Sequence, residues 1–321
     1  MSEFHVETLR VGPLEKHPNA DSLSITRVRD YPVILRTGEL QEGDLAVYVP
    51  VDSVVPAGDP RWAFLGEHRR IQARRLRGIF SMGLLTAAPP GATEGQDVAA
   101  LLGITKYEPP EPPAEGEDEI DPGFFPAYSD LEAIRRFPDV LAEGEEVVLT
   151  EKVHGANARY LFHEGRLWVG SHTRIKRRDP KNLWWKPAIA LDLERRLAAF
   201  PGIAIYGEVY GRVQDLRYGA KDDGVALVLF DAQDVTSRRY LDYDDFLALA
   251  RALELPTVPL LHRGPWSQDL RALSNGPTVI GAGAHCREGF VARPVKERFD
   301  ERVGRVALKL HGEDYLLRKS R

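Results

Sequence analysis

Residues 145–163 read EEVVLTEKVHGANARYLFH and decide how the second half of the chain is interpreted. The apolar run at 147–149 predicts a strand that continues to Lys152. Segments 158–162 and 167–171 then read as the two strands of a β-hairpin. A lysine therefore directly follows an apolar strand and precedes a hairpin.

Predicted helices and strands alternate after this hairpin. Apolar residues recur at helical spacing in 186–200 and in 243–255, and Asp242 is a candidate cap for the second helix. Further strands are predicted at 203–211, 225–232, 288–293 and 305–311. This pattern predicts an α+β domain whose sheet is largely antiparallel.

The first part of the chain reads as short strands punctuated by Gly, Pro, Asn or Asp. They are predicted at 22–30, 31–38, 44–55 and 78–86. A small β-barrel of the OB kind is the economical interpretation. Segment 17–23, HPNADSL, resembles the opening of OB modules that bind tRNA, and the alternative is a polar turn before a strand.

An acidic, proline-rich segment separates the two parts. Between Lys106 and Pro126 there are seven acids and six prolines, a composition unsuited to a buried core. We expect an OB-like module at 1–105, a linker at 106–126 and a second domain at 127–321.

Composition excludes several classes of protein. With 321 residues, 43% apolar and 28% charged, the chain is expected to be globular and to have two domains. No apolar run is long enough to span a membrane, and the charged N-terminus does not read as a signal peptide, so we expect a cytoplasmic protein without membrane contact. The single cysteine, Cys286, excludes an intramolecular disulfide and a Cys-rich zinc site. Any metal must then be held by oxygen or imidazole.

The tetrad Lys-x-x-Gly carries little information by itself. The chain contains three such matches, beginning at Lys152, Lys221 and Lys309. Only Lys152 has a supporting context, because it alone ends an apolar strand and precedes a hairpin.

The string TEKVHGAN at 150–157 resembles the covalent nucleotidyltransferases, specifically the ATP-dependent RNA ligases, whose attachment motif often reads Glu-Lys-x-His-Gly-x-Asn. The remaining motifs of that family follow in order at 170–173 (GSHT), 206–211 (YGEVYG), 229–232 (LFDA), 288–291 (EGFV) and 308–310 (LKL). The resemblance extends to RRLRGIFSMGLL at 74–85, and the OB-first order matches a clade of RNA ligases with an N-terminal OB module.

The resemblance implies two catalytic lysines. Lys152 would attack the α-phosphorus of ATP to give lysyl-AMP, although a free lysine amine has a pKa of about 10.4. Lys309 would lower the pKa of Lys152 and neutralise the α-phosphate.

The resemblance also implies a nucleotide-binding set and a metal. Glu208 would face the ribose, Glu288 a divalent metal and its waters, and we expect both carboxylates at a Mg²⁺ or Mn²⁺ site. Phe230 would stack on adenine, and Gly155 would permit close approach of the backbone. The full expected nucleotide-binding set is Glu151, His154, Gly155, Asn157, Ser171, Arg174, Lys176, Glu208, Phe230 and Glu288.

Two departures from the family pattern are visible. The last family motif usually has a Lys-x-Lys pair, whereas this chain has Ala307 at the earlier position and Arg305 two residues before it. Related ligases often have arginine where this chain has His172, so Arg174 or Lys176 is expected to replace that contact.

Several of these residues have a plain structural alternative. Phe230 lies in an apolar strand and is a core residue by default. Glu208 and Glu288 are alternatively solvated carboxylates at strand edges, but burial in these mostly apolar strands would require a partner for each charge.

Two basic segments suggest a surface for nucleic acid. Residues 61–80 contain six arginines and one acid, and residues 166–186 contain seven basic residues and one acid. Together with Trp184 and Trp185 they offer cations and stacking faces, while the alternative is a solvated surface with both tryptophans in the core. The expected RNA contacts are Arg69, Arg70, Arg74, Arg75, Arg77, Arg177 and Arg178.

These features predict an ATP-dependent RNA ligase that seals nicks next to an RNA 3′-hydroxyl in RNA repair. Its expected partner is RNA as a nicked duplex or broken strand, including RNA/DNA hybrids, and the expected oligomeric state is a monomer. The alternatives are a DNA ligase, an mRNA capping enzyme and an inactive OB-based RNA-binding protein.

Overall fold

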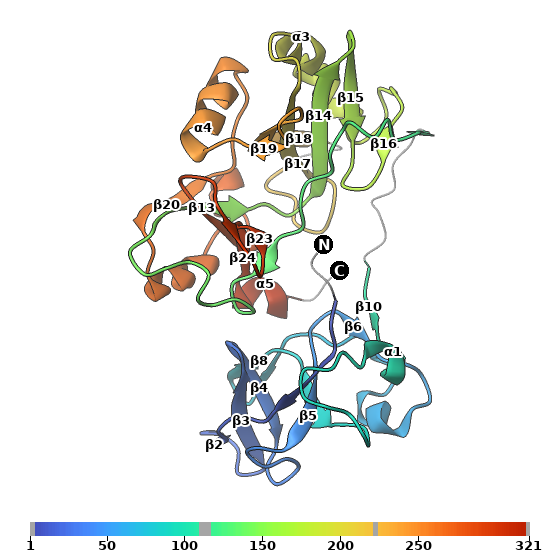
Figure 1. Cartoon of the computed structure of the whole chain (residues 1–321), viewed down its shortest axis with the longest axis vertical. Helices are drawn as coiled ribbons and strands as arrows, with labels where there is room; N and C mark the ends of the chain where they lie inside the picture. The colour runs from blue at the N-terminus through green and yellow to red at the C-terminus, as the bar shows by residue number, and fades with distance from the viewer. Residues whose placement is uncertain (1–3, 109–116, 221–223, 319–321) are drawn as a thin grey trace. The chain divides into compact units, whose positions relative to one another are not determined.

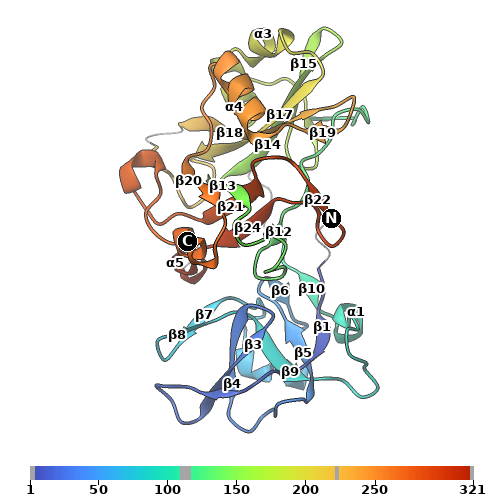
Figure 2. The same ribbon diagram turned by 60° about the vertical axis from the view of Figure 1, so that its left-hand side comes forward.

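The computed structural model describes residues 4–108, 117–220 and 224–318. It divides into two compact units, Met1–Pro110 with Arg135–Pro138, and Glu111–Ile134 with Asp139–Arg321. Both units are built mainly from antiparallel sheets with a few short helices, which confirms the predicted α+β class (Figures 1 and 2). Among the described residues, no helix is long and apolar enough to cross a bilayer.

Small sheets form the first unit (Figure 2). Their orders are β1-β5-β9, β2-β3-β4, β7-β8 and β10-β6. The strands are β1 (Glu7–Arg10), β2 (Glu15–Lys16), β3 (Leu23–Val28), β4 (Tyr31–Arg36), β5 (Leu45–Val49), β6 (Ser53–Val54), β7 (Arg74–Leu76), β8 (Ile79–Ser81), β9 (Leu84–Ala87) and β10 (Thr105–Lys106). The helical elements are the 3₁₀ helix η1 (Pro60–Leu65) and α1 (Ala99–Leu102).

The predicted strands of this unit are present, but two of them are divided. Segment 44–55 splits into β5 and β6 because Asp52 adopts a φ of 65°, and 78–86 splits into β8 and β9 at Gly83, whose φ is 77°. The polar segment at 17–23 makes a turn between β2 and β3. Its His17 is 1% exposed, accepts the Asn19 N–H at 3.0 Å and lies 3.2 Å from the Leu76 carbonyl, so it ties this turn to the β7–β8 hairpin.

Two sheets form the framework of the second unit (Figure 1). The seven-stranded sheet has the order β11-β16-β15-β14-β17-β18-β19, and the five-stranded sheet has the order β12-β24-β21-β13-β20. The first contains β11 (Asp118–Glu119), β14 (Ala156–His163), β15 (Arg166–Gly170), β16 (Ile175–Lys176), β17 (Ile203–Gly211), β18 (Val225–Asp234) and β19 (Arg239–Tyr240). The second contains β12 (Glu132–Ala133), β13 (Glu146–Lys152), β20 (Leu260–Pro265), β21 (Gly289–Pro294) and β24 (Leu308–His311). A separate hairpin pairs β22 (Phe299–Asp300) with β23 (Gly304–Arg305).

Helices cover one face of the seven-stranded sheet. α2 (Trp185–Ala190) and α4 (Tyr243–Ala252) contact β18, and α3 (Leu193–Ala198) contacts β14 and β15. Trp184 and Trp185 are 2% and 4% exposed in the core beneath these helices, as the structural alternative for them predicts. The remaining helical elements are η2 (Gln268–Ser274), η3 (Ile280–Gly283) and α5 (Glu313–Leu317).

Two expectations for this unit need correction. The helix predicted at 186–200 is two helices, because Asp192 adopts a left-handed φ of 49° between them.

The acidic linker predicted at 106–126 lies partly outside the described residues. From 117 to 126 it belongs to the second unit, where β11 pairs with β16 and Phe125 is 2% exposed in the core. Its acids find basic partners there, and composition alone does not show this.

A buried ion cluster joins the two sheets of the second unit. Asp231 on β18 is 1% exposed and accepts from Arg293 at 2.8 Å, from the Tyr128 hydroxyl at 2.9 Å and from Arg305 at 2.7 Å. Glu297 accepts from Arg305 at 2.6 Å and 2.7 Å. Arg305 is thus buried and paired with Asp231 and Glu297, so its charge is not available to replace the missing lysine of the last motif.

Loss of Asp231 should destabilise the second unit strongly. Asp231→Ala leaves two buried guanidinium groups short of a partner, and breaking such a cluster costs about 3–5 kcal/mol. Urea unfolding followed by tryptophan fluorescence measures this, since four of the five tryptophans lie in this unit. The matched control is Asp244→Ala, which removes an exposed pair with Arg263 and should change the midpoint little. Equal midpoints for the two variants would contradict the prediction.

Candidate functional site

Lys152 lies at the end of β13, where three strands of the five-stranded sheet come into register. It pairs across the sheet with Gly289 on β21, which in turn pairs with His311 on β24. Two residues earlier in β13, Thr150 pairs with Val291, which pairs with Lys309. Because alternate residues of a strand share a face, Lys152, Lys309 and His311 project from the same side of this sheet.

Glu288, directly before β21, is the anionic centre of the site. It is 4% exposed, and its Oε1 lies 2.8 Å from Lys152 Nζ and 3.3 Å from His311 Nε2. Its Oε2 lies 3.6 Å from His154 Nδ1. Burial alone would raise the pKa of Glu288, but Lys152, His154 and His311 outweigh it and hold that pKa well below its ordinary value. Glu288 is therefore a buried, charged carboxylate and not a solvated edge residue.

Glu208 brings a second carboxylate from the seven-stranded sheet. It lies on β17 opposite Asn157 on β14, and burial raises its pKa to about 8. Burial would lower the pKa of Lys152, but Glu288 and Glu208 outweigh it and raise that pKa. This differs from the predicted lowering at Lys152. The lowered pKa is instead that of Lys309, which is buried and repelled by the Lys152 charge.

Two glycines allow the backbone to close around these groups. A Cβ on Gly155 would overlap the Val209 carbonyl oxygen, so the turn after Lys152 can lie against β17 only with glycine there. A Cβ on Gly289 would overlap the Leu310 carbonyl oxygen in the same way, between Lys152 and His311. The predicted close approach at Gly155 is thus present.

Phe230 occupies a β-bulge in β18. Gly207 pairs with Leu229 and Tyr206 with Asp231, which leaves Phe230 as the extra residue. Its ring is partly exposed and meets Tyr128 edge-on at 4.9 Å between centroids. Because the bulge interrupts the regular alternation of side chains, Phe230 keeps part of its ring accessible, and such a ring is suited to stack on a ligand.

Glu151 points away from the nucleophile and fixes a loop. It is 1% exposed and accepts from the Thr278 hydroxyl at 2.5 Å and from the Val279 N–H at 2.8 Å. Its carboxylate is therefore satisfied within the protein. Asn157, by contrast, has a buried side-chain oxygen to which the described residues supply no hydrogen-bond donor.

The segment after Gly170 does not join this cluster through its basic residues. Ser171 closes a turn by accepting the Arg174 N–H at 3.1 Å. Arg174 and Lys176 both bond Asp118, at 2.9 Å and 2.7 Å, and Lys176 is 5% exposed. The acidic segment neutralises these cations, so in this structure neither is available to replace the contact expected at His172.

The candidates for RNA contact fall into two groups. Arg69, Arg74, Arg75 and Arg77 of the first unit are exposed, while Arg70 bonds Asp52 at 2.7 Å and lies over the Tyr107 ring. In the second unit, Arg177 pairs with Glu117, and Arg178 pairs with Glu194 at 2.7 Å.

Sequence reasoning missed His311, and it missed Asp215, Tyr218, Tyr315 and Arg318 around His154. The alternation of Leu308-Lys309-Leu310-His311 is a signal for His311, because it places the histidine on the face of Lys309. Ala307, where the family has a lysine, is 3% exposed. Asp215 and Tyr218 lie in a loop, Tyr315 lies in the short helix α5 and Arg318 directly follows it, and no periodicity identifies them.

The carboxylates of the site fit a divalent cation in part. Within the described ranges, no set of three or more His, Cys, Asp and Glu side chains is arranged to hold a metal by itself. Glu288 Oε2 is nevertheless buried without a hydrogen-bond donor from the described residues. Carboxylate oxygens suit Mg²⁺ or Mn²⁺, whose remaining positions are filled by water or by phosphate oxygens.

Comparisons with known proteins agree with the motif order. Residues 145–311 match the family model described as RNA ligase, and residues 6–88 match an OB-fold domain model. A solved Naegleria gruberi RNA ligase mutant with ATP and Mn is 22% identical, with 98% of each chain covered and a TM-score of 0.85. The same values hold for a mutant with AMP and Mn. The structure of that ligase with PPi is 23% identical, with 98% of each chain covered and a TM-score of 0.84. A search of curated proteins finds no match.

The raised pKa of Glu208 predicts a pH-dependent stability. Between its ordinary pKa of 4.5 and its folded value of about 8, the folded protein keeps a proton that the unfolded chain releases. Stability is therefore lost as pH rises through this window. Glu208→Gln removes this loss, so its Tm relative to the unsubstituted protein should rise from about pH 5 to about pH 8 and then level off. Thermal melts with EDTA and without nucleotide measure the difference, and a pH-independent difference would contradict it.

Proposed function

The chain belongs to the RNA ligase family, since the family model covers just over half of its length, and on this premise we propose that it joins RNA ends with ATP through a lysyl-AMP intermediate. The observation that carries this proposal is the convergence of Lys152, Glu288, Glu208 and Lys309 from two sheets. The Naegleria gruberi ligase structures of the same fold hold ATP and Mn, AMP and Mn, or PPi, which supports these ligands as candidates.

In the first step, the Lys152 amine attacks the α-phosphorus of ATP. A nitrogen–phosphorus bond forms, and the bond from the α-phosphorus to the bridging oxygen breaks with release of pyrophosphate. Lys152 must first lose its proton, although Glu288 and Glu208 raise its pKa. A divalent cation bound by these carboxylates would supply positive charge that offsets both them and the phosphates. Such a cation would reduce the negative potential that holds the proton on Lys152.

Lys309 and Phe230 serve the nucleotide in this proposal. Lys309 shares a sheet face with Lys152, so its side chain suits the α-phosphate. Phe230 suits the adenine ring because the bulge exposes part of its face. The buried side-chain oxygen of Asn157, beside Glu208, accepts no hydrogen bond from the described residues, so it suits a donor group of the nucleoside.

The later steps act on RNA. AMP passes from Lys152 to a 5′-phosphate, and a 3′-hydroxyl then attacks that phosphate and displaces AMP to form the phosphodiester. We propose nicks with an RNA 3′-hydroxyl strand, in RNA duplexes or RNA/DNA hybrids, as the substrate class and a monomer as the active form. The exposed arginines of the first unit are the proposed contacts to RNA phosphates.

Labelling of the protein by ATP tests the chemistry. With α-labelled ATP and Mg²⁺ or Mn²⁺, the denatured wild type should retain label, whereas Lys152→Ala should retain none and Lys309→Ala should lose most of it. Label from GTP in place of ATP would indicate capping, and sealing of DNA ends in preference to RNA ends would indicate a DNA ligase. No label with either nucleotide would overturn the enzymatic function in favour of an RNA-binding protein.

Substitution of the exposed arginines tests the RNA surface. Arg74, the first residue of β7, and Arg77, in the β7–β8 turn, are each replaced by alanine. Each lost phosphate contact should lower the slope of log K against log salt by about 0.7–0.9. Arg263→Ala is the matched control, because its cation is already paired with Asp244. Fluorescence anisotropy of nicked duplex RNA at several salt concentrations measures the slopes. Unchanged slopes in both test variants would place the RNA surface elsewhere.

A further inference from the structure

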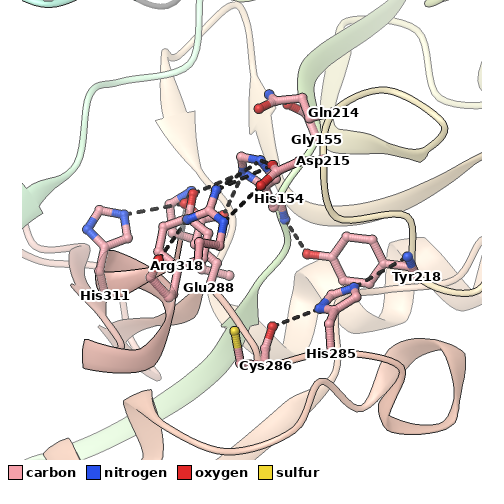
Figure 3. Close-up of polar contacts among 12 residues, drawn as sticks. His154, Gly155, Gln214, Asp215, Tyr218, His285, Cys286, Glu288, His311 and Arg318 are labelled. Carbon is pink, nitrogen blue, oxygen red and sulfur yellow. Dashed lines mark hydrogen bonds and ion pairs between the residues drawn. The ribbon is translucent and has the colours of Figure 1, made fainter. Parts of the chain in front are cut away.

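One loop, 212–220, holds the turn that follows the nucleophile (Figure 3). The Gln214 amide donates to the Gly155 carbonyl. The Tyr218 hydroxyl accepts the His154 N–H at 2.5 Å, and Asp215 Oδ1 lies 2.8 Å from His154 Nε2. All three contacts are made to His154 and Gly155, so this loop fixes the position of the turn next to Lys152.

Asp215 is itself held from the opposite side. Arg318 Nε donates to Asp215 Oδ2 at 3.0 Å, and Arg318 Nη2 reaches Oδ1 at 3.4 Å (Figure 3). Burial would raise the pKa of Asp215, but Arg318 and His154 outweigh it and lower that pKa, so the carboxylate is charged. Tyr315, on the adjoining α5, places its hydroxyl 3.1 Å from His154 Nδ1.

The Nδ1 edge of the His154 ring lies near the carboxylate of Glu288. His154 Nδ1 lies 3.6 Å from Glu288 Oε2, and Glu288 Oε1 lies 2.8 Å from Lys152 Nζ. The His154 side chain is only 12% exposed. A ring contacted at both nitrogens cannot turn without losing one of these contacts, so the partner of Nε2 sets the position of Nδ1.

We propose that Asp215 is a positioning residue for lysine adenylylation. Arg318 holds the Asp215 carboxylate, and Asp215 orients the His154 ring against Glu288. The ring in turn fixes the Glu288 carboxylate opposite the Lys152 amine. Asp215 acts through His154, since its polar partners within the described part of the chain are His154 and Arg318. The inference rests on the proposed function, because it assigns a role in the first step of that reaction.

A purely structural role would have a different signature. Both side chains of the Asp215–Arg318 pair are only about one-fifth exposed, so breaking this pair is expected to lower stability whichever role it has. A structural ion pair would therefore change the melting temperature and the labelling rate independently of what stands at position 154. A positioning residue affects the rate only while its target is present.

The experiment is a double-mutant cycle on the rate of protein labelling. Asp215→Asn is combined with His154→Asn, whose shorter amide retains a polar group near the Nδ1 position but extends nothing toward Asp215. Labelling of the full chain is followed in single turnovers with α-labelled ATP and Mn²⁺ over a range of ATP concentrations. Asp244→Asn, at an exposed carboxylate paired with Arg263, is the control for loss of a charge.

We expect Asp215→Asn to slow the maximal labelling rate about tenfold or more, with a smaller change in the ATP concentration for half-maximal rate. In the His154→Asn background the same substitution should cause no further loss. Arg318→Gln should give a smaller loss that also vanishes in that background, which keeps the test decisive if Asp215→Asn folds poorly. Sealing of a pre-adenylylated RNA strand should be less affected, because this substrate bypasses the first step.

Two results would overturn the inference while leaving the ligase function intact. One is a labelling rate for Asp215→Asn equal to that of the wild type. The other is an undiminished loss in the His154→Asn background, which would make the two residues independent. If the wild type itself is not labelled, the proposed function fails and not merely the role of Asp215.

Discussion

The burial of a charged carboxylate at Glu288 is the constraint on which the rest of the site depends. A buried anion is stable only with compensating partners, and here they are Lys152, His154 and His311. These residues come from β13, the turn after it and β24, so β13, β21 and β24 must be held in one register. Glycine at 289 lets the strands meet closely enough for this. This carboxylate raises the pKa of Lys152, and a divalent cation bound to it would offset that effect.

The second sheet completes the site through local irregularities. Gly155 lets the turn after β13 lie against β17, which brings Glu208 into the field of Lys152. The bulge at Phe230 interrupts β18 at the position where a partly exposed ring suits a base. Directly after it, Asp231 is fully enclosed with Arg293 and Arg305. These adjacent residues of one strand thus differ in burial, because Phe230 is partly exposed and Asp231 is enclosed, although both contact Tyr128.

The sequence predicts much of this because strands and motifs are local. Strand 203–211 coincides with β17, and Lys152, Glu208 and Glu288 meet as the motif order implies. What local pattern cannot predict is pairing at a distance. Arg174 and Lys176 read as candidates for the nucleotide but bond Asp118, which lies in a segment whose composition suggests a linker. Arg305 reads as a possible spare cation but is enclosed with Asp231. Asp215 and Arg318 belong to no periodic element, so only the folded chain shows their contact with His154.

The distance along the chain between these partners has a consequence for synthesis. His154 contacts Tyr315, 161 residues later, and Arg318, 164 residues later. Contacts of such high sequence separation form late, because the intervening chain must be ordered first. During translation, the first unit has all of its strands long before β24 and α5 exist. A ribosome-bound chain would therefore present a folded OB module while Lys152 still lacks Lys309 and His311 beside it and His154 lacks its contacts with Tyr315 and Arg318, so lysine adenylylation would have to wait until α5 has emerged.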